Sequence, residues 1–199
     1  MKIGVLALQG DFAEHIRQLR RLGVGAVEVR LPEELSDLDG LIIPGGESTT
    51  IGKLAVAYGL MEPLRAFSAE KPLWGTCAGM IFMAKDIGYD QPHLGIMDIV
   101  VERNAFGRQV DSFEIDLDIH GLTTDAKPFP AVFIRAPRLV QAHNGVRILA
   151  QLPGGAAVAA QQGYWLVTAF HPELTDDPRF HQYFLEVVAR ARQARHSPA

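Results

Sequence analysis

Short, uninterrupted apolar runs alternate with helically spaced apolar positions through the first part of the chain. An apolar run without polar alternation, such as residues 3–8, is typical of a strand that is covered on both faces. Apolar side chains then recur at helical spacing from Phe12 to Leu22, and Asp11 can cap that helix. The pattern further predicts strands at 26–30, 41–43 and 72–74, and helices that begin near 49 and span 80–87. This order predicts an α/β fold with a mostly parallel sheet and helices on its faces.

The remainder of the chain is richer in strands. We expect strands at 96–102, 113–119, 131–134, 146–152, 156–161 and 166–170, with few helices between them. Some should form an antiparallel extension, and the others should complete the main sheet. A final helix begins near 177. Its apolar side chains fit helical spacing and predict core packing rather than a cofactor site; they are Phe180, Tyr183, Phe184, Val187, Val188 and Ala191.

Composition narrows the function classes. The chain has 199 residues, of which 48% are hydrophobic and 21% charged, which suits one compact domain with a sizeable core. We expect this domain at 1–192 and a frayed polar tail at 193–199. A net charge of −4 argues against nucleic acid as the main partner, and no apolar run approaches the roughly 20 residues that span a membrane. The single cysteine cannot form an intrachain disulfide, which fits a reducing cytoplasm.

That cysteine lies in Gly75-Thr76-Cys77-Ala78-Gly79, between a predicted strand and a predicted helix. The spacing is typical of the sharp strand-to-helix turn that presents a nucleophile. Glycines relieve the crowding of the backbone in such a turn, and a helix N-terminus favours a thiolate. The alternative is a buried structural cysteine beside a glycine-rich turn. Because the glycine spacing favours thiol chemistry, the rest of the chain should supply a base.

Among seven histidines, only His171 directly follows a predicted buried strand, and Pro172-Glu173 comes next. A residue before proline favours extended backbone, and residues two apart in an extended chain point the same way. His171 could therefore take the proton of Cys77 while Glu173 orients its ring. Cys77 and His171 both follow strands, at the sheet end where active residues of open α/β folds gather. The alternative is a surface turn that ends a strand.

The loop at 44–50, Pro-Gly-Gly-Glu-Ser-Thr-Thr, also lies between a predicted strand and a helix. Its N–H groups could line an oxyanion pocket, and Glu47 and Ser48 could bind a polar substrate. Alternatively, Ser48 and Thr49 cap the helix. A phosphate loop is excluded, because five residues separate Gly46 from Gly52 where four are required.

Other cofactor sites are not indicated. Glu28 stands where a dinucleotide fingerprint starting at Gly23 would need its third glycine. The histidines are scattered, so we expect no metal site.

Together, the three segments around Gly46, Cys77 and His171 resemble the class I, triad-type glutamine amidotransferases. Further segments resemble the family of glutaminase subunits of pyridoxal 5′-phosphate synthases: Leu8-Gln9-Gly10, residues 45–50, residues 101–109, residues 111–114 and Phe133-Ile134-Arg135-Ala136-Pro137. The resemblance covers roughly residues 2–190, and it implies a three-layer, flavodoxin-like fold. Ala105 stands where the family commonly has Ser, and the C-terminal tail is unmatched. Neither departure affects a residue to which the resemblance assigns a role.

The resemblance implies a role for each matched residue. Cys77 would be the nucleophile, His171 the base and then the acid, and Glu173 the group that orients His171. The oxyanion N–H groups would come from Gly46 and Ala78. The residues that would hold glutamine are Gly46, Glu47, Ser48, Arg103, Ile134 and Arg135. An arginine suits an α-carboxylate because its guanidinium can bind both oxygens; the alternative for Arg103 and Arg135 is surface ion pairing.

The implied reaction is hydrolysis of the side-chain amide of L-glutamine to glutamate and ammonia. In this family, the ammonia passes to a partner synthase barrel within a hetero-oligomer, where pyridoxal 5′-phosphate is built. That product belongs to the partner, so we expect no cofactor in this chain. The family also implies weak activity until the partner docks, and Gln9 is a plausible contact. The Gly45-Gly46 pair could permit a peptide flip when the site is activated.

Two other functions remain open at this stage. One is a free-standing cysteine hydrolase of the same fold, such as a γ-glutamyl hydrolase, which would need no partner. The other is a non-catalytic glutamine-binding or scaffold subunit. An intact Cys77, His171 and Glu173 argues against a scaffold, which has no need of all three groups.

Overall fold

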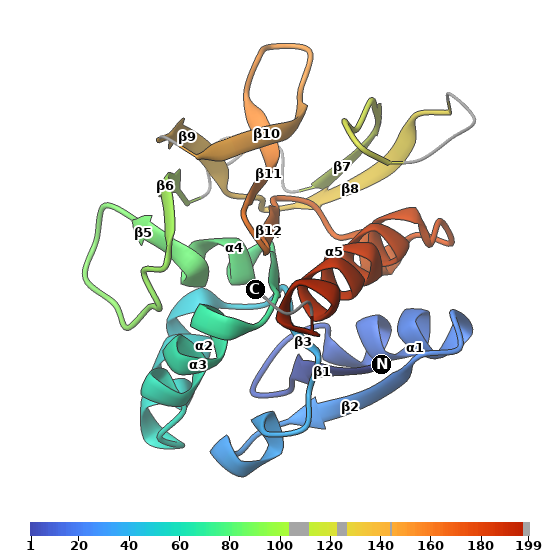
Figure 1. The fold of residues 1–199 in the computed structure, drawn as a ribbon. Coiled ribbons are helices and arrows are strands. Elements are labelled where there is room, and N and C mark those ends of the chain that lie inside the picture. The colour runs from blue at the N-terminus through green and yellow to red at the C-terminus, as the bar shows by residue number, and fades with distance from the viewer. Residues whose placement is uncertain (104–111, 123–126, 144, 197–199) are drawn as a thin grey trace.

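The computed structural model describes residues 1–103, 112–122, 127–143 and 145–196. Its first part follows the predicted alternation of strands and helices (Figure 1). The elements are β1 (Lys2–Leu6), α1 (Phe12–Arg21), β2 (Gly25–Val29), the short 3-10 helix η1 (Pro32–Leu35), β3 (Gly40–Ile43), α2 (Ser48–Ala57), α3 (Met61–Glu70), β4 (Leu73–Thr76) and α4 (Ala78–Met83).

The second part is dominated by strands, as the sequence predicted. Its elements are β5 (Ala84–Asp86), β6 (Met97–Glu102), β7 (Ser112–Leu117), β8 (Phe129–Ile134), β9 (Arg138–Ala142), β10 (Val146–Gln151), β11 (Ala157–Gln162), β12 (Trp165–Thr168), the 3-10 helix η2 (Pro172–Leu174) and α5 (Arg179–His196).

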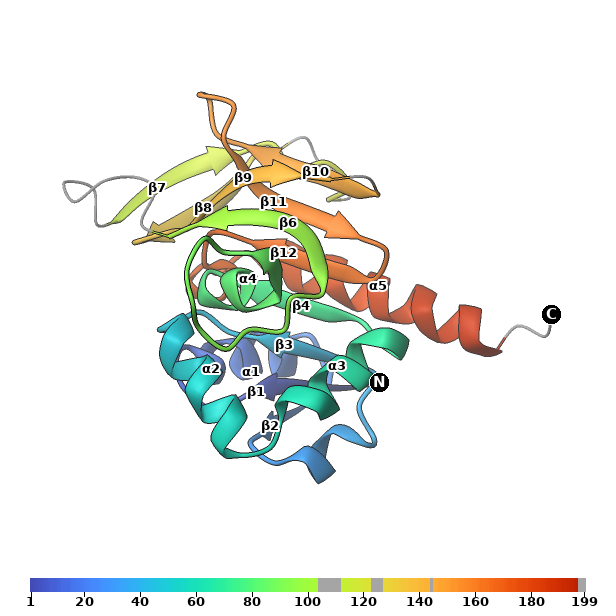
Figure 2. The same cartoon turned by 90° about the vertical axis from the view of Figure 1, so that its left-hand side faces the viewer.

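A parallel sheet in the order β2-β1-β3-β4-β12 forms the centre of the molecule. This is the flavodoxin-like order, and it confirms the predicted α/β fold. Helices α1 and α5 cover one face, and α2 and α3 cover the other (Figures 1 and 2). Because the strands are parallel, the loops that follow β1, β3, β4 and β12 lie at one edge of the sheet, and the segments around Gly46, Cys77 and His171 lie there.

The antiparallel extension is also confirmed. Strands β11, β9 and β6 continue the sheet beyond β12, with antiparallel pairing at each step, and β10 pairs with β11. Strands β7 and β8 form a separate antiparallel pair, which lies beside α5 in the upper part of Figure 1. Ser112 pairs with Ile134, the last residue of β8.

The structure differs from the prediction in one helix and in one additional strand. The helix expected at 80–87 is α4, which ends at Met83, and residues 84–86 form β5 beside β6. The run from Met80 to Ala84 is buried throughout, and a short apolar run does not distinguish helix from strand. Strand β9 was not predicted. Its Leu139 is buried and Val140 is exposed, so the segment offers little apolar pattern, and pairing with β6 determines its conformation.

The core prediction for the last helix is confirmed. Every residue of its apolar stripe is buried, and Phe180 and Phe184 pack on Trp74 of β4 with ring centroids 5.8 and 5.6 Å apart. Helix α5 continues to His196, so residues 193–196 of the predicted tail are helical, and 197–199 lie outside the described residues. Within the described ranges, no helix is both long enough and apolar enough to cross a membrane.

Candidate active site

The Gly-x-Cys-x-Gly segment forms the sharp turn that its spacing predicted. Cys77 lies between β4 and α4 with φ 47° and ψ −102°, a backbone conformation that costs a non-glycine residue about 1–3 kcal/mol. The two glycines permit the close approach of neighbouring backbone. A Cβ on Gly75 would lie 2.5 Å from the Gly79 backbone, and a Cβ on Gly79 would lie 2.1 Å from the carbonyl oxygen of Ile43. The turn therefore requires glycine at both positions and presents the thiol at the sheet edge.

His171 and Glu173 form a buried pair at the end of β12. The Nδ1 atom of His171 lies 2.7 Å from Oε1 of Glu173, and the two side chains are only 4% and 0% exposed. The backbone N–H of His171 donates to the carbonyl of Val132 in β8 at 2.8 Å, which fixes the segment against that strand. Pro172 starts the short helix η2, so the imidazole and the carboxylate reach each other within one turn.

The imidazole of His171 links the carboxylate to the thiol. Burial alone would lower the pKa of His171, but hydrogen bonds with Cys77 and Glu173 raise it to about 10. The protonated imidazole is therefore favoured at neutral pH, beside Cys77. Burial raises the pKa of Glu173, and the hydrogen bond from His171 opposes that effect. The structure thus brings together Cys77, His171 and Glu173, which the sequence had placed on two separate strands.

The loop after β3 contacts this group directly. A Cβ on Gly45 would lie 2.4 Å from Cε1 of His171, so the loop backbone packs against the imidazole. Gly46 has φ 155°, and its neighbour Glu47 donates its N–H to Oε1 of Gln9 at 2.6 Å. Gln9 thereby holds the loop in its present conformation. Ala78, the other residue predicted to supply an oxyanion N–H, is the first residue of α4 and directly follows Cys77.

Glu47 caps helix α2, a role for which the sequence offered Ser48 and Thr49 as the alternative interpretation of this loop. Its carboxylate accepts hydrogen bonds from the N–H groups of Thr49 at 3.1 Å and Thr50 at 2.7 Å. Partial burial raises the pKa of Glu47, but the hydrogen bonds from Thr50 and Thr49 lower it to about 2. Ser48 is buried, and its hydroxyl lies 3.4 Å from Oε1 of Gln91.

Arg103 lies beside the same carboxylate. Its guanidinium donates to Oε1 of Glu47 at 2.9 Å and to Oγ1 of Thr49 at 3.2 Å, and it stacks over the ring of Tyr89 at 5.2 Å. Glu47 and Arg103 come from segments far apart in the sequence, and the fold places their opposite charges side by side.

Ile134 and Arg135 complete the set of predicted residues. Ile134 ends β8, and its carbonyl oxygen lies 3.9 Å from Sγ of Cys77. Arg135 follows with φ 42°, an unusual conformation for a non-glycine residue, and its side chain is exposed. Such strain tends to persist where surrounding contacts over-determine the backbone, often at ligand sites.

Comparison with known proteins assigns the chain to a family. The model of the SNO glutamine amidotransferase family matches residues 5–190. The chain belongs to this family.

Individual relatives match the amidotransferase over almost its whole length. The "Pyridoxal 5'-phosphate synthase subunit PdxT" of Geobacillus kaustophilus is 56% identical over 196 residues, covering 98% of each chain. Its counterpart from Pelotomaculum thermopropionicum is 57% identical over 195 residues, covering 97% of this chain and 98% of its own. A crystal structure of a glutamine amidotransferase, 54% identical, superposes with a TM-score of 0.89 over 95% of this chain and all of that one. A putative GMP synthase protein from Thermoplasma acidophilum, 18% identical with a TM-score of 0.71 over 99% of this chain and 98% of its own, shares the fold.

The amidotransferase site also contains residues that sequence reasoning missed. Asp11 was expected to cap α1, but its side chain makes no cap hydrogen bond, and Oδ2 instead lies 3.6 Å from Nδ1 of His171. Burial raises the pKa of Asp11, while the charge of His171 opposes this. Its position just after β1, at the same sheet edge, was the available signal. Asp11, His171 and Glu173 place one ligand atom each within 4.8 Å of one another, but the direct bond between His171 and Glu173 occupies two of those atoms.

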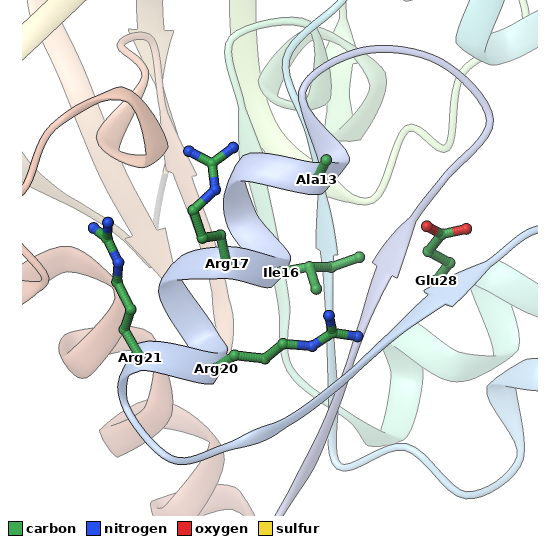
Figure 3. A pocket seen from close by; sticks show the side chains of 6 residues that line it. All are labelled: Ala13, Ile16, Arg17, Arg20, Arg21 and Glu28. Atoms are coloured by element: carbon green, nitrogen blue, oxygen red, sulfur yellow. The ribbon is translucent and has the colours of Figure 1, made fainter.

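A separate hollow of about 580 Å³ lies between α1 and β2 of this amidotransferase (Figure 3). It is lined by Ala13, Ile16, Arg17, Arg20, Arg21 and Glu28. Arg17 pairs with Glu14 at 3.2 Å, and Arg21 pairs with Asp176 at 3.2 Å. The hollow includes no residue of the predicted site.

Proposed function

We propose that this chain hydrolyses L-glutamine to L-glutamate and ammonia with Cys77, His171 and Glu173, and that it supplies the ammonia to a pyridoxal 5′-phosphate synthase subunit. The observation that carries the proposal is the buried His171–Glu173 pair, hydrogen bonded at 2.7 Å and coupled to a cysteine in a strained strand-to-helix turn. Membership of a glutamine amidotransferase family supports glutamine as the substrate. Relatives named as subunits of pyridoxal 5′-phosphate synthase support the use of the ammonia.

The reaction uses Cys77 as the nucleophile and the protonated imidazole of His171 as the acid. The Cys77 sulfur attacks the side-chain carbonyl carbon of glutamine, and the C=O electrons move to oxygen. Backbone N–H groups of Gly46 and Ala78 stabilise that oxyanion. His171, held protonated by its two hydrogen bonds, gives its proton to the amide nitrogen, and the C–N bond breaks to release ammonia. Water, deprotonated by His171, then attacks the γ-glutamyl thioester, which releases glutamate and restores the thiolate.

Substrate binding uses two charged side chains, Glu47 of the loop after β3 and Arg103 after β6. Glu47 suits the ammonium of glutamine, and Arg103 suits its carboxylate, because each carries the opposite charge; their mutual ion pair of 2.9 Å would open to admit the amino acid. Ser48, Ile134 and Arg135 complete the binding residues. Ile134 offers a backbone carbonyl next to the thiol, where the carboxamide of glutamine must lie.

The proposal also includes the partner subunit of this chain, its cellular compartment and its domain bounds. A hetero-oligomer with the synthase barrel keeps ammonia from the solvent, and the single cysteine fits the cytoplasm. Residues 1–192 act as a single glutaminase domain, and the chain itself needs no metal or cofactor.

The decisive experiment measures ammonia release from glutamine by the purified chain, with and without the synthase barrel subunit. We expect strong activity only in the mixture. Cys77→Ala should abolish ammonia release while it leaves thermal unfolding and partner binding unchanged, and His171→Asn should also remove activity. Strong activity without a partner would favour a free-standing hydrolase. Partner binding with no ammonia release under either condition would favour a scaffold subunit, and full activity of Cys77→Ala would refute the mechanism.

A further inference from the structure

The second carboxylate oxygen of Glu173 faces a histidine that the reaction described above does not use. Oε1 of Glu173 bonds to His171, while Oε2 lies 3.3 Å from Nε2 of His15 in α1, with both side chains 0% exposed. Oε2 has no hydrogen bond of good geometry among the described residues. A buried carboxylate oxygen without a donor is costly, and catalytic hydrogen bonds are often long in a free enzyme and tighten in the substrate complex. His15 is placed to be that donor.

His15 is itself held by a second buried histidine. Its Nδ1 lies 3.0 Å from Nε2 of His181 in α5, and its Nε2 lies 3.3 Å from Oγ1 of Thr76. Both imidazoles meet the ring of Trp74 in a T-shaped arrangement, with ring centroids 5.5 and 5.0 Å away. Burial, followed by the charges of His181 and His171, lowers the pKa of His15 well below its usual value, and burial lowers the pKa of His181 to about 3. Both rings are therefore neutral at neutral pH, and each carries one N–H.

The contacts select the tautomers of the two rings. If His15 carried its hydrogen on Nδ1, its bare Nε2 could accept from the hydroxyl of Thr76, but it would also face the carboxylate of Glu173 at 3.3 Å, which is repulsive. His181 would then have its hydrogen on Nδ1, which has no partner among the described residues. A hydrogen on Nε2 of each ring removes both problems. His181 then donates to Nδ1 of His15, and His15 can donate from Nε2 to Glu173.

We propose that His15 is a positioning residue that donates its Nε2–H to Oε2 of Glu173, with His181 fixing its tautomer. The two oxygens of Glu173 would then both accept hydrogen bonds, one from His15 and one from His171. A carboxylate held at both oxygens keeps its plane, and so it keeps the ring of His171 directed at Cys77. The role rests on the proposed reaction of Cys77, His171 and Glu173.

The test replaces the donor and then restores it. His15→Leu removes the N–H, and His15→Gln returns an amide N–H near the position of Nε2 together with an acceptor for His181. In the complex with the synthase subunit, we expect His15→Leu to lower kcat about 10- to 100-fold with KM little changed. His15→Gln should recover most of kcat. Phe184→Leu, which loosens the same packing around Trp74 without touching Glu173, controls for loss of stability.

Spectroscopy tests the same idea without an activity assay. Ring ¹⁵N spectra of the full chain should show His15 neutral, with its hydrogen on Nε2, and the His15→Gln and His181→Gln variants identify the two rings among the seven histidines. A hydrogen on Nδ1 of His15 would overturn the proposal. So would a kcat for His15→Leu within about threefold of wild type, or an equal loss for Leu and Gln. His171→Asn, assayed in parallel, separates the cases: if it stays active, the proposed reaction itself has failed.

Discussion

Gly45→Ala tests whether the loop after β3 holds the imidazole of His171 in place. The backbone of Gly45 is in a region open to any residue, so an added methyl brings no backbone strain. Its Cβ would lie 2.4 Å from Cε1 and 2.9 Å from Nδ1 of His171, where ordinary contacts begin at 3.4 Å. The ring or the loop must therefore retreat by about 1 Å, a misplacement that can cost about 100-fold in rate. Retreat of the ring also weakens its 2.7 Å bond to Glu173.

The assay measures kcat and KM for ammonia release in the presence of the synthase subunit. Gly154→Ala is the matched control, because a Cβ at Gly154 would meet nothing within 4 Å. We expect Gly45→Ala to fold and to lose about 100-fold in kcat, while Gly154→Ala keeps wild-type rates. A folded Gly45→Ala whose kcat stays within about threefold of wild type would show that the loop does not position His171.

Three further outcomes follow from the same contacts. Arg103→Lys should raise KM for glutamine about tenfold with little change in kcat, because an ammonium cannot bind a carboxylate bidentately; an unchanged KM would count against this role. Glu173→Gln should lower kcat at least about 100-fold, since a neutral amide does not stabilise the imidazolium, and near-normal turnover would contradict it. The pKa of His171, raised from 6.5 to about 10, adds stability that is fully present below pH 6.5 and is lost toward pH 10. The difference in unfolding free energy between wild type and His171→Asn should therefore shrink across that range, by up to about 1.4 kcal/mol per pH unit, in denaturant titrations; a constant difference would contradict the assignment.

The parallel centre of the fold could be predicted because its signals are local and strong. Unbroken apolar runs at β1, β3 and β4 are followed within two residues by glycine or proline, and the stripe of α5 is long enough to fix its period. Strand β9 and the early end of α4 could not be predicted, since each depends on pairing with β6. One buried and one exposed residue, such as Leu139 and Val140, are too few to show the alternating hydrophobic pattern of a strand, and tertiary contacts decide their conformation.

The residues of the candidate site also divide into those that the sequence indicated and those that only the structure revealed. Cys77 and the His171–Glu173 pair stand out because each follows a strand and carries a short, constrained spacing. Asp11 and His15 did not stand out in the sequence. An aspartate just before a helix is interpreted as a cap, and nothing in the sequence distinguishes His15 from the other six histidines. Their importance depends on where α1 lies against η2 and α5. That packing is a tertiary property, and no spacing within the chain specifies it.

The free energies of the contacts around Glu47 indicate which step the synthase subunit should assist. Glutamine must open the pair of Arg103 and Glu47, but Glu47 is 46% exposed, and such surface pairs contribute only about 0–1 kcal/mol. Moving the loop is more costly, because Glu47 also caps α2, worth about 0.5–2 kcal/mol, and its N–H is bonded to Gln9. Binding of glutamine is thus easily accommodated, whereas rearrangement of the Gly46 peptide is resisted. We therefore expect the synthase subunit to raise kcat far more than it lowers KM; titrating glutaminase kinetics with that subunit measures both, and a change confined to KM would refute this reasoning.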